Sequence, residues 1–253
     1  MVGTSMTTAL VLLALAFNLQ GPFALADEAK LSPHEIVRRA DSHRMPEGMI
    51  SFLATVHEYN GSKLTHDTRY KVLSRSERRE AAALCETIYP ERQRGRKLLM
   101  EKDDLWLYTP DTKRPVRVSR QQRLTGEIAN GDLVSTNLQD DYDATLEGHE
   151  KIEDEPVFHL KLSANRSSVT YEKIDYWVSE KDFLPVRAIF YAVSGKALKE
   201  GVYLKPKKIL GKLTITEVKF TDALNKEHQS VLIYSEQKKV NIPDQAFNKE
   251  NLG

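Results

Sequence analysis

Residues that could support catalysis or metal binding are scattered along this sequence and form few recognisable patterns. There is no Gly-x-Ser-x-Gly nucleophile motif, no glycine-rich phosphate-binding loop and no His-Glu-x-x-His motif. The seven histidines lack the tight spacing of a zinc site. We therefore expect a protein that is not an enzyme and that has no catalytic residues, no cofactor and no bound metal.

One pair of histidines forms a partial exception to this pattern. His57 and His66 flank the Asn60-Gly61 turn, where they could lie opposite each other beside Glu58 and Asp67. Two imidazoles with two carboxylates could bind a metal ion. Two histidines on a surface hairpin are more often simply solvated, and we favour that interpretation.

Two further groups could carry acid–base or nucleophilic chemistry. Asp140, Asp141 and Asp143 form an acidic run, but acidic residues in a loop usually contact solvent, and nothing in the sequence fixes their geometry. Ser194 could join Asp182 and a histidine in a triad only if the fold brought them together. The turn-forming pair Ser194-Gly195 is explained more simply by a tight turn.

Cys85 is the only cysteine, so no intrachain disulfide is possible. It ends the apolar stretch 81–85, and no catalytic motif surrounds it. We expect it to be a small buried hydrophobic residue rather than a reactive thiol.

The 37 basic and 36 acidic side chains leave a net charge of +1, so a nucleic-acid partner is not expected. Local basic clusters could attract anionic lipid headgroups, or they could be solvated strand edges that prevent unwanted pairing. These clusters are Arg75, Arg78 and Arg79, then Arg92, Arg94, Arg96 and Lys97, and later Lys205, Lys207 and Lys208.

The N-terminal residues resemble an export signal. The apolar run 9–17 is followed by Gly21-Pro22 and by Ala24-Leu25-Ala26, a small-x-small cleavage site. The run is shorter than the roughly 20 residues needed to cross a bilayer. We expect a signal peptide over residues 1–26, cleavage after Ala26, and a single domain over 27–253 that works in the periplasm.

The elements of this domain follow from capping and periodicity. Ser32-Pro33-His34-Glu35 has the pattern of a capping box, which predicts a helix to about Arg44. Asn60-Gly61 and Ser194-Gly195 predict hairpin turns. A short helix is expected around 132–138, and a last helical turn near Pro243 should pack Phe247 and Leu252. A two-residue period predicts antiparallel strands at 48–59, 63–74, 79–88, 96–102, 104–109, 114–119, 144–151, 156–163, 171–179, 184–193, 197–204, 208–221 and 228–237.

Several of these strands are apolar on both faces. In the segment 183–191, Leu184 and Phe190 point to one side, whereas Phe183 and Ile189 point to the other. An antiparallel sheet with one face in water would be polar on that face. The sheet is therefore either curved around an apolar cavity and covered by helices, or closed as a barrel with a filled interior.

The order of motifs from Asp104 onward resembles the LolA-like outer-membrane lipoprotein-sorting proteins, especially the branch associated with RND-type exporters. The resemblance covers roughly 150 residues. It is carried by residues 105–110 (LWLYTP), 117–119 (RVS), 141–148 (DYDATLEG), 171–178 (YEKIDYWV), 185–191 (PVRAIFY), 195–199 (GKALK) and 243–247 (PDQAF).

This resemblance implies a mainly β (α+β) fold, in which a strongly curved antiparallel sheet forms an unclosed β-barrel plugged by a few helices. It also implies a carrier that shuttles lipoprotein or lipid acyl chains toward the outer membrane, with transient membrane contact and with an RND-type exporter and an outer-membrane acceptor as partners. The alternatives are a lipid-acting hydrolase and a non-carrying exporter subunit. We expect the acyl-chain cavity to be lined by Trp106, Tyr108, Phe158, Leu160, Tyr176, Phe190, Val218 and Phe220.

Overall fold

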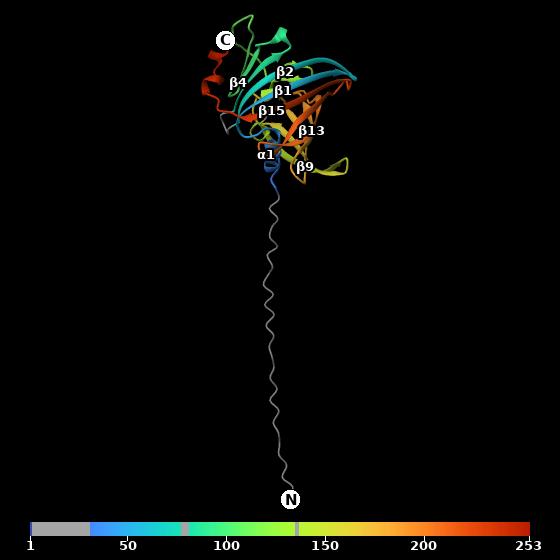
Figure 1. Ribbon diagram of the computed structural model, residues 1–253. Helices are drawn as coiled ribbons and strands as arrows, with labels where there is room; N and C mark the ends of the chain where they lie inside the picture. Colours follow the sequence, from blue (N-terminus) through green and yellow to red (C-terminus); the bar gives the residue numbers. More distant parts are fainter. Residues whose placement is uncertain (2–30, 77–80, 135–136) are drawn as a thin grey trace. The chain divides into compact units, whose positions relative to one another are not determined.

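The fold is built on one long antiparallel sheet, whose strands curve around an interior in Figure 1. The computed structural model describes Met1 and residues 31–76, 81–134 and 137–253. The predicted signal peptide, apart from Met1, lies outside these residues. Thirteen strands follow one another in the order β6-β5-β4-β3-β2-β1-β15-β14-β13-β12-β11-β10-β9. Strands β6 and β9 are the two ends of this order, so the sheet is not closed among the described residues, and the expected unclosed barrel is confirmed.

The sheet curls because twisted open sheets rarely exceed about ten strands while remaining open and flat. In chain order the elements are α1 (Pro33–Arg44), β1 (Gly48–Asn60), β2 (Lys63–Ser76), β3 (Ala82–Tyr89), η1 (Glu91–Gln93), β4 (Lys97–Glu101), β5 (Asp104–Tyr108), β6 (Val116–Arg117), β7 (Arg123–Thr125), β8 (Ile128–Ala129), α2 (Asn130–Val134), α3 (Leu138–Asp141), β9 (Tyr142–Ile152), β10 (Glu155–Ala164), β11 (Lys173–Ser179), β12 (Pro185–Tyr191), β13 (Ala197–Ile209), β14 (Lys212–Asp222), β15 (His228–Lys239), η2 (Asp244–Phe247) and η3 (Lys249–Asn251).

Helix α1 begins as predicted, but only half of the capping box forms. The Ser32 hydroxyl accepts a hydrogen bond from the Glu35 backbone N–H at 3.2 Å. The Glu35 carboxylate does not return to the cap, because it accepts hydrogen bonds from Arg38 and Arg39 one turn later. Ile36, Val37 and Ala40 form the buried face of the helix, which packs on strands β9, β11, β12 and β14.

The hairpin turns at Asn60-Gly61 and Ser194-Gly195 are confirmed, whereas the predicted break between residues 204 and 208 is wrong. Strand β13 continues through Pro206 to Ile209, and the chain turns at Leu210-Gly211 instead. Proline is tolerated here because β12 pairs with β13 only as far as Val202, which leaves the Pro206 edge of the strand without a neighbour that needs its N–H.

The segment between β6 and β9 holds more structure than predicted. The single helix expected at 132–138 is two short helices, α2 and α3, and residues 135–136 between them are outside the described part. The β7–β8 pair was not predicted, because strands of three and two residues are too short to show a period. None of the helices among the described residues is long and apolar enough to span a bilayer.

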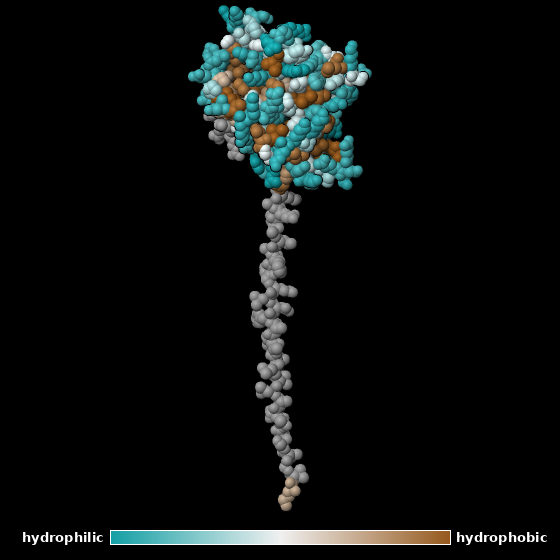
Figure 2. All heavy atoms as spheres, viewed as in Figure 1, coloured by the Kyte–Doolittle hydropathy of each residue, from teal (hydrophilic) through white to brown (hydrophobic). Residues whose placement is uncertain are grey.

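Both faces of the sheet are buried where β3, β4 and β5 cross the molecule. On β4, Leu98 and Met100 join the main hydrophobic cluster, whereas Leu99 between them joins a second cluster. The predicted C-terminal turn supplies this second cluster with Phe247 and Leu252. On the face seen in Figure 2, hydrophobic side chains form separate patches between hydrophilic ones. The residues of the main cluster are buried, and helices α1 to α3 contact the strands that contribute to it.

Candidate functional site

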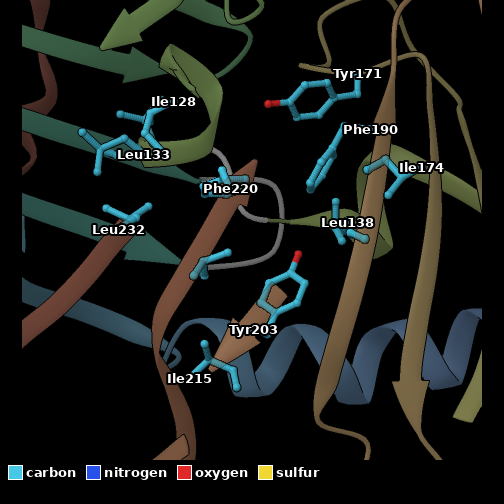
Figure 3. Close-up of a cluster of buried hydrophobic side chains, with 14 of the residues drawn as sticks. Ile128, Leu133, Leu138, Tyr171, Ile174, Phe190, Tyr203, Ile215, Phe220 and Leu232 are labelled. Carbon is cyan, nitrogen blue, oxygen red and sulfur yellow. The ribbon is translucent and has the colours of Figure 1, made fainter. Parts of the chain in front are cut away.

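A small apolar hollow lies between the curved sheet and helices α1 to α3. Figure 3 shows Leu138, Tyr171, Phe190 and Tyr203 pointing into the same space. The hollow has a free volume of about 40 Å³, enough for only a few water molecules. Its lining comes from the sheet, the three helices and the loops beside α3 and before β11, and consists of Arg44, Asp132, Asn137, Leu138, Asp141, Tyr142, Thr170, Tyr171, Ile174, Phe190, Tyr203, Ile215, Val218, Phe220 and Tyr234.

Aromatic rings form the wall at the β12–β14 side of the hollow. The Phe190 ring centroid lies 4.5 Å from that of Tyr171 and 6.1 Å from that of Phe220. Gly201 on the intervening strand β13 makes this arrangement possible. A Cβ atom there would lie 3.1 Å from Phe190 and 3.2 Å from Phe220. The two rings are thus packed to contact distance against the backbone of β13, with no room for a side chain at residue 201.

A buried lysine joins this wall to helix α2. Lys199 is only 4% exposed, and its ammonium group donates hydrogen bonds to the Asp132 carboxylate and to the Glu127 carbonyl oxygen. Its Nζ also lies 4.2 Å from the centroid of the Phe220 ring. The Tyr171 hydroxyl donates to the same carboxylate at 2.7 Å.

These groups are taken out of water, and their proton affinities change accordingly. Burial lowers the pKa of Lys199, and the Asp132 carboxylate opposes that shift. Burial raises the pKa of Tyr171, and Asp132 raises it further. Because a buried charge without its partner is costly, the Lys199–Asp132 ion pair holds α2 against the sheet.

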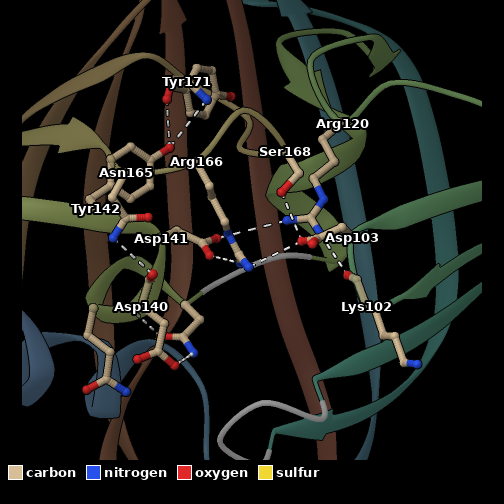
Figure 4. Close-up of polar contacts among 12 residues, drawn as sticks. Lys102, Asp103, Arg120, Asp140, Asp141, Tyr142, Asn165, Arg166, Ser168 and Tyr171 are labelled. Atoms are coloured by element: carbon tan, nitrogen blue, oxygen red, sulfur yellow. Dashed lines mark hydrogen bonds and ion pairs between the residues drawn. The ribbon is translucent and has the colours of Figure 1, made fainter.

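A second polar cluster holds helix α3 at the opposite side of the hollow. Figure 4 shows Arg166 between Asp141 of α3 and Asp103 of the β4–β5 turn. Arg120, whose side chain is almost fully buried, lies 4.0 Å from Asp141 and donates to the Lys102 carbonyl oxygen at 2.8 Å. Burial lowers the pKa of Arg120, and the neighbouring Arg166 lowers it further.

Helix α3 is also tied to α1. The Asp41 carboxylate accepts a hydrogen bond from the Gln139 backbone N–H at 2.8 Å and another from Arg44 at 2.8 Å. The side chain of Arg44 is itself largely buried at the edge of the hollow. Helices α2 and α3 lie outside the hydrogen-bonded sheet and are held by side-chain contacts and by backbone bonds to loops, such as Gly131 N–H to the Arg120 carbonyl oxygen at 3.0 Å. Their displacement would therefore leave the strand pairing intact.

The eight residues expected to line a cavity fall into three groups. Phe190, Val218 and Phe220 line the hollow. Leu160 and Tyr176 are fully buried in the main cluster, and Phe158 is partly buried against it. Trp106 and Tyr108 lie in the second cluster, against the C-terminal segment on the other face of the sheet.

Several residues that line the hollow or contact its aromatic wall were not predicted from the sequence. Lys199 and Asp132 carry charge and were therefore not considered as interior residues. The alternation of Ala197, Lys199 and Gly201 along β13 is the signal that could have placed Lys199 inward. Leu138 and Tyr203 also line the hollow. The helix that contains Leu138 has only four residues, too few for a helical period to be recognised in the sequence.

The histidine pair at the first hairpin is not arranged as a metal site. The register pairs His57 with Asp67 and His66 with Glu58, so each imidazole faces a carboxylate and the two rings lie on opposite faces of the hairpin. The expectation that the histidines could lie opposite each other is therefore wrong. No group of three or more potential metal ligands occurs among residues 31–76, 81–134 and 137–253.

The other reactive side chains are also separated or buried. Ser194 is exposed on the β12–β13 turn, whereas Asp182 accepts a hydrogen bond from the Leu184 N–H before β12 begins. The seven residues of β12 separate them by about 23 Å. Cys85 is buried, and burial raises the pKa of its thiol, as expected for a hydrophobic residue.

Comparison with known proteins identifies relatives of this architecture. A family model described as an uncharacterized protein matches residues 79–253. The crystal structure of a LolA superfamily protein from Nitrosomonas europaea is 35% identical, with a TM-score of 0.81 over 87% of this chain and 98% of that chain. A DUF1329 family protein from Desulfovibrio piger is 20% identical, with a TM-score of 0.76 over 87% and 98% of the two chains.

A third structure shows the same fold. A domain described as a candidate outer membrane lipoprotein-sorting protein, from Vibrio parahaemolyticus, is 21% identical, with a TM-score of 0.75 over 87% of this chain and 97% of that chain. A search of curated proteins finds no match.

Proposed function

Because this chain belongs to the LolA superfamily, we propose that it is a non-enzymatic carrier that binds the acyl chains of a lipid or lipoprotein in the hollow beneath α2 and α3. The observation that carries the proposal is the composition of this site. Its strand side is apolar, with Phe190, Phe220, Val218 and Ile215, while its other side is closed by short helices.

The hollow must open to receive such a cargo. A free volume of about 40 Å³ does not admit an acyl chain, so binding requires displacement of α2 or α3. Burying ten methylene groups is worth about 8 kcal/mol. Breaking a buried ion pair such as Lys199–Asp132 costs about 3–5 kcal/mol. The free energy gained by burying an acyl chain is therefore large enough to offset the loss of this ion pair. Re-formation of the ion pair closes the empty hollow and so favours release of the cargo.

The proposal includes the cellular location of the carrier and its partners. We propose that residues 1–26 are removed after Ala26 and that the domain 27–253 carries its cargo through the periplasm. An RND-type exporter in the inner membrane and an acceptor in the outer membrane are the proposed partners. The resemblance of the segments from Asp104 to Phe247 to the exporter-associated branch supports this pathway.

Native mass spectrometry of the protein purified without detergent tests the proposal. The expected result is a population with lipid adducts, whose acyl chains are then identified by lipid extraction. Absence of adducts, together with failure of a fluorescent acyl probe to bind the delipidated protein, would contradict it.

A further inference from the structure

The β13–β14 hairpin extends beyond both of its neighbours in the sheet. Pairing of β12 with β13 ends at Val202, and pairing of β14 with β15 begins at Glu217. Residues 206–209 and 212–215 therefore pair in the sheet only with each other. The tip turns at Leu210 and Gly211, whose φ angles of 50° and 89° are those of a tight hairpin turn.

This projecting hairpin is strongly basic. No acidic residue occurs between Glu200 and Glu217, whereas Lys205, Lys207, Lys208 and Lys212 all lie in that interval and are exposed. Lys205 donates to the Glu217 carboxylate at 2.6 Å. Within the described part of the chain, the other three lysines form no ion pair, so their charge faces solvent.

The tip also exposes large apolar side chains among these lysines. Leu210 is 44% exposed and Leu213 is 36% exposed, and Ile209 beside them is half-buried. Leucines surrounded by lysines match the two layers of a membrane surface, because the apolar groups enter the acyl boundary while the cations meet anionic headgroups.

The same hairpin reaches the hollow at its inner end. Tyr203 and Ile215 line the hollow, and the His43 ring of α1 hydrogen-bonds to the Leu213 carbonyl oxygen at 2.7 Å. We infer that the tip of the β13–β14 hairpin docks on the surface of an anionic lipid bilayer. This contact goes beyond cargo binding, because it assigns the surface through which the hollow meets a membrane.

Vesicle co-sedimentation of the full chain tests this inference. Wild-type protein should bind phosphatidylcholine vesicles that contain phosphatidylglycerol more tightly than vesicles of phosphatidylcholine alone, and raising the salt from about 0.01 M to about 1 M should abolish the difference. Replacing the three lysines in K207E/K208E/K212E should lower the apparent affinity for the anionic vesicles by about a hundredfold. Leu210→Ser should lower it by about tenfold.

Two controls make the result specific. The charge-preserving variant K207R/K208R/K212R should bind as the wild type does. Leu224→Ser with Lys226→Glu alters a matched exposed leucine and lysine at the β14–β15 turn, where Leu224 is 76% exposed, and should leave binding unchanged. All variants keep the same N-terminal segment, so differences between them report on the hairpin.

The inference is overturned if the wild type shows no preference for anionic vesicles. It is also overturned if K207E/K208E/K212E, with an unchanged unfolding midpoint, binds as tightly as the wild type. Neither result depends on whether lipid is found in the hollow.

Discussion

Lys199 of strand β13 and Asp132 of helix α2 form a buried ion pair that connects the aromatic wall of the hollow to the helix that covers it. The same carboxylate accepts hydrogen bonds from Tyr171 and from the Ala129 backbone N–H. One charged group thus joins three segments around an otherwise apolar site. In the proposed carrier, this pair is one of the contacts that stabilise the closed hollow relative to the open one.

Lys199→Met should destabilise the protein, because Asp132 would remain buried without its cation. The expected loss in the free energy of unfolding is about 3–5 kcal/mol, measured by urea denaturation followed by circular dichroism. The double variant Lys199→Met/Asp132→Leu should recover most of this loss, since it buries no unpaired charge. Strictly additive effects of the two substitutions would show that the pair is not coupled.

Gly131→Ala should disturb the contact between α2 and the loop before β11. A Cβ atom at Gly131 would lie 1.8 Å from the Thr170 hydroxyl oxygen and 2.9 Å from the Thr170 Cβ. We expect a loss of about 1–3 kcal/mol in the free energy of unfolding, and partial recovery in Gly131→Ala/Thr170→Gly. Gly148→Ala is the matched control, because a Cβ atom added there would meet nothing within 4 Å. A loss in the control as large as that in Gly131→Ala would argue against the packing explanation.

The protein should lose stability steeply above about pH 10, because burial raises the pKa of its interior tyrosines. A group whose pKa is raised by folding contributes stability below its unfolded pKa, and that stability is lost as the pH rises. Each such tyrosine contributes about 1.4 kcal/mol per pH unit. The lowered pKa of Lys199 acts in the opposite direction, but for one proton only. The tyrosines are Tyr70, Tyr142, Tyr171, Tyr176, Tyr203 and Tyr234.

Urea unfolding midpoints measured from pH 8 to pH 11.5 check this dependence, with tyrosinate absorbance recorded in parallel. Ionisation of the buried tyrosines should coincide with unfolding. Titration of all ten tyrosines of the chain near pH 10 while the sheet stayed folded would show that these side chains are open to water, and would contradict the prediction.

Gly201→Val should weaken binding of a fluorescent acyl probe by at least about tenfold, because the added methyl groups displace Phe190 and Phe220 into the hollow. Gly148→Val, where the space is open, should bind the probe normally. Trp106→Ala should also bind it normally, although it removes a large ring, since Trp106 packs on the opposite face of the sheet. If Trp106→Ala weakened probe binding as much as Gly201→Val does, the binding site would lie at the second cluster instead.

Much of the fold could be predicted because the sequence signals of antiparallel strands and hairpin turns are local. Their two-residue period is local, and turns such as Asn60-Gly61 carry their own signal. The course of β13 could not be predicted, because whether Pro206 is tolerated depends on how far the neighbouring strand β12 extends. That is a property of the assembled sheet and not of the local sequence.

The site was predictable to a smaller degree. Apolar positions such as Phe190 and Phe220 show that a face is buried, but a period of two does not say which face lines the hollow. Trp106 and Tyr108 share that period and lie against the C-terminal segment instead. Lys199 could not be placed in the interior from the sequence, because a lysine is normally assigned to the surface. Its burial is explained only by the ion pair with Asp132 of α2.

In the proposed carrier, acyl chains occupy the space between the sheet and helices α2 and α3. A phospholipid carrying a photoreactive diazirine in its acyl chain tests this directly, with the labelled residues mapped by peptide mass spectrometry. We expect labelling of strands β12 and β14, at or beside Phe190 and Phe220. Labelling confined to the C-terminal segment beside Trp106 and Tyr108, or no labelling of any peptide, would contradict it.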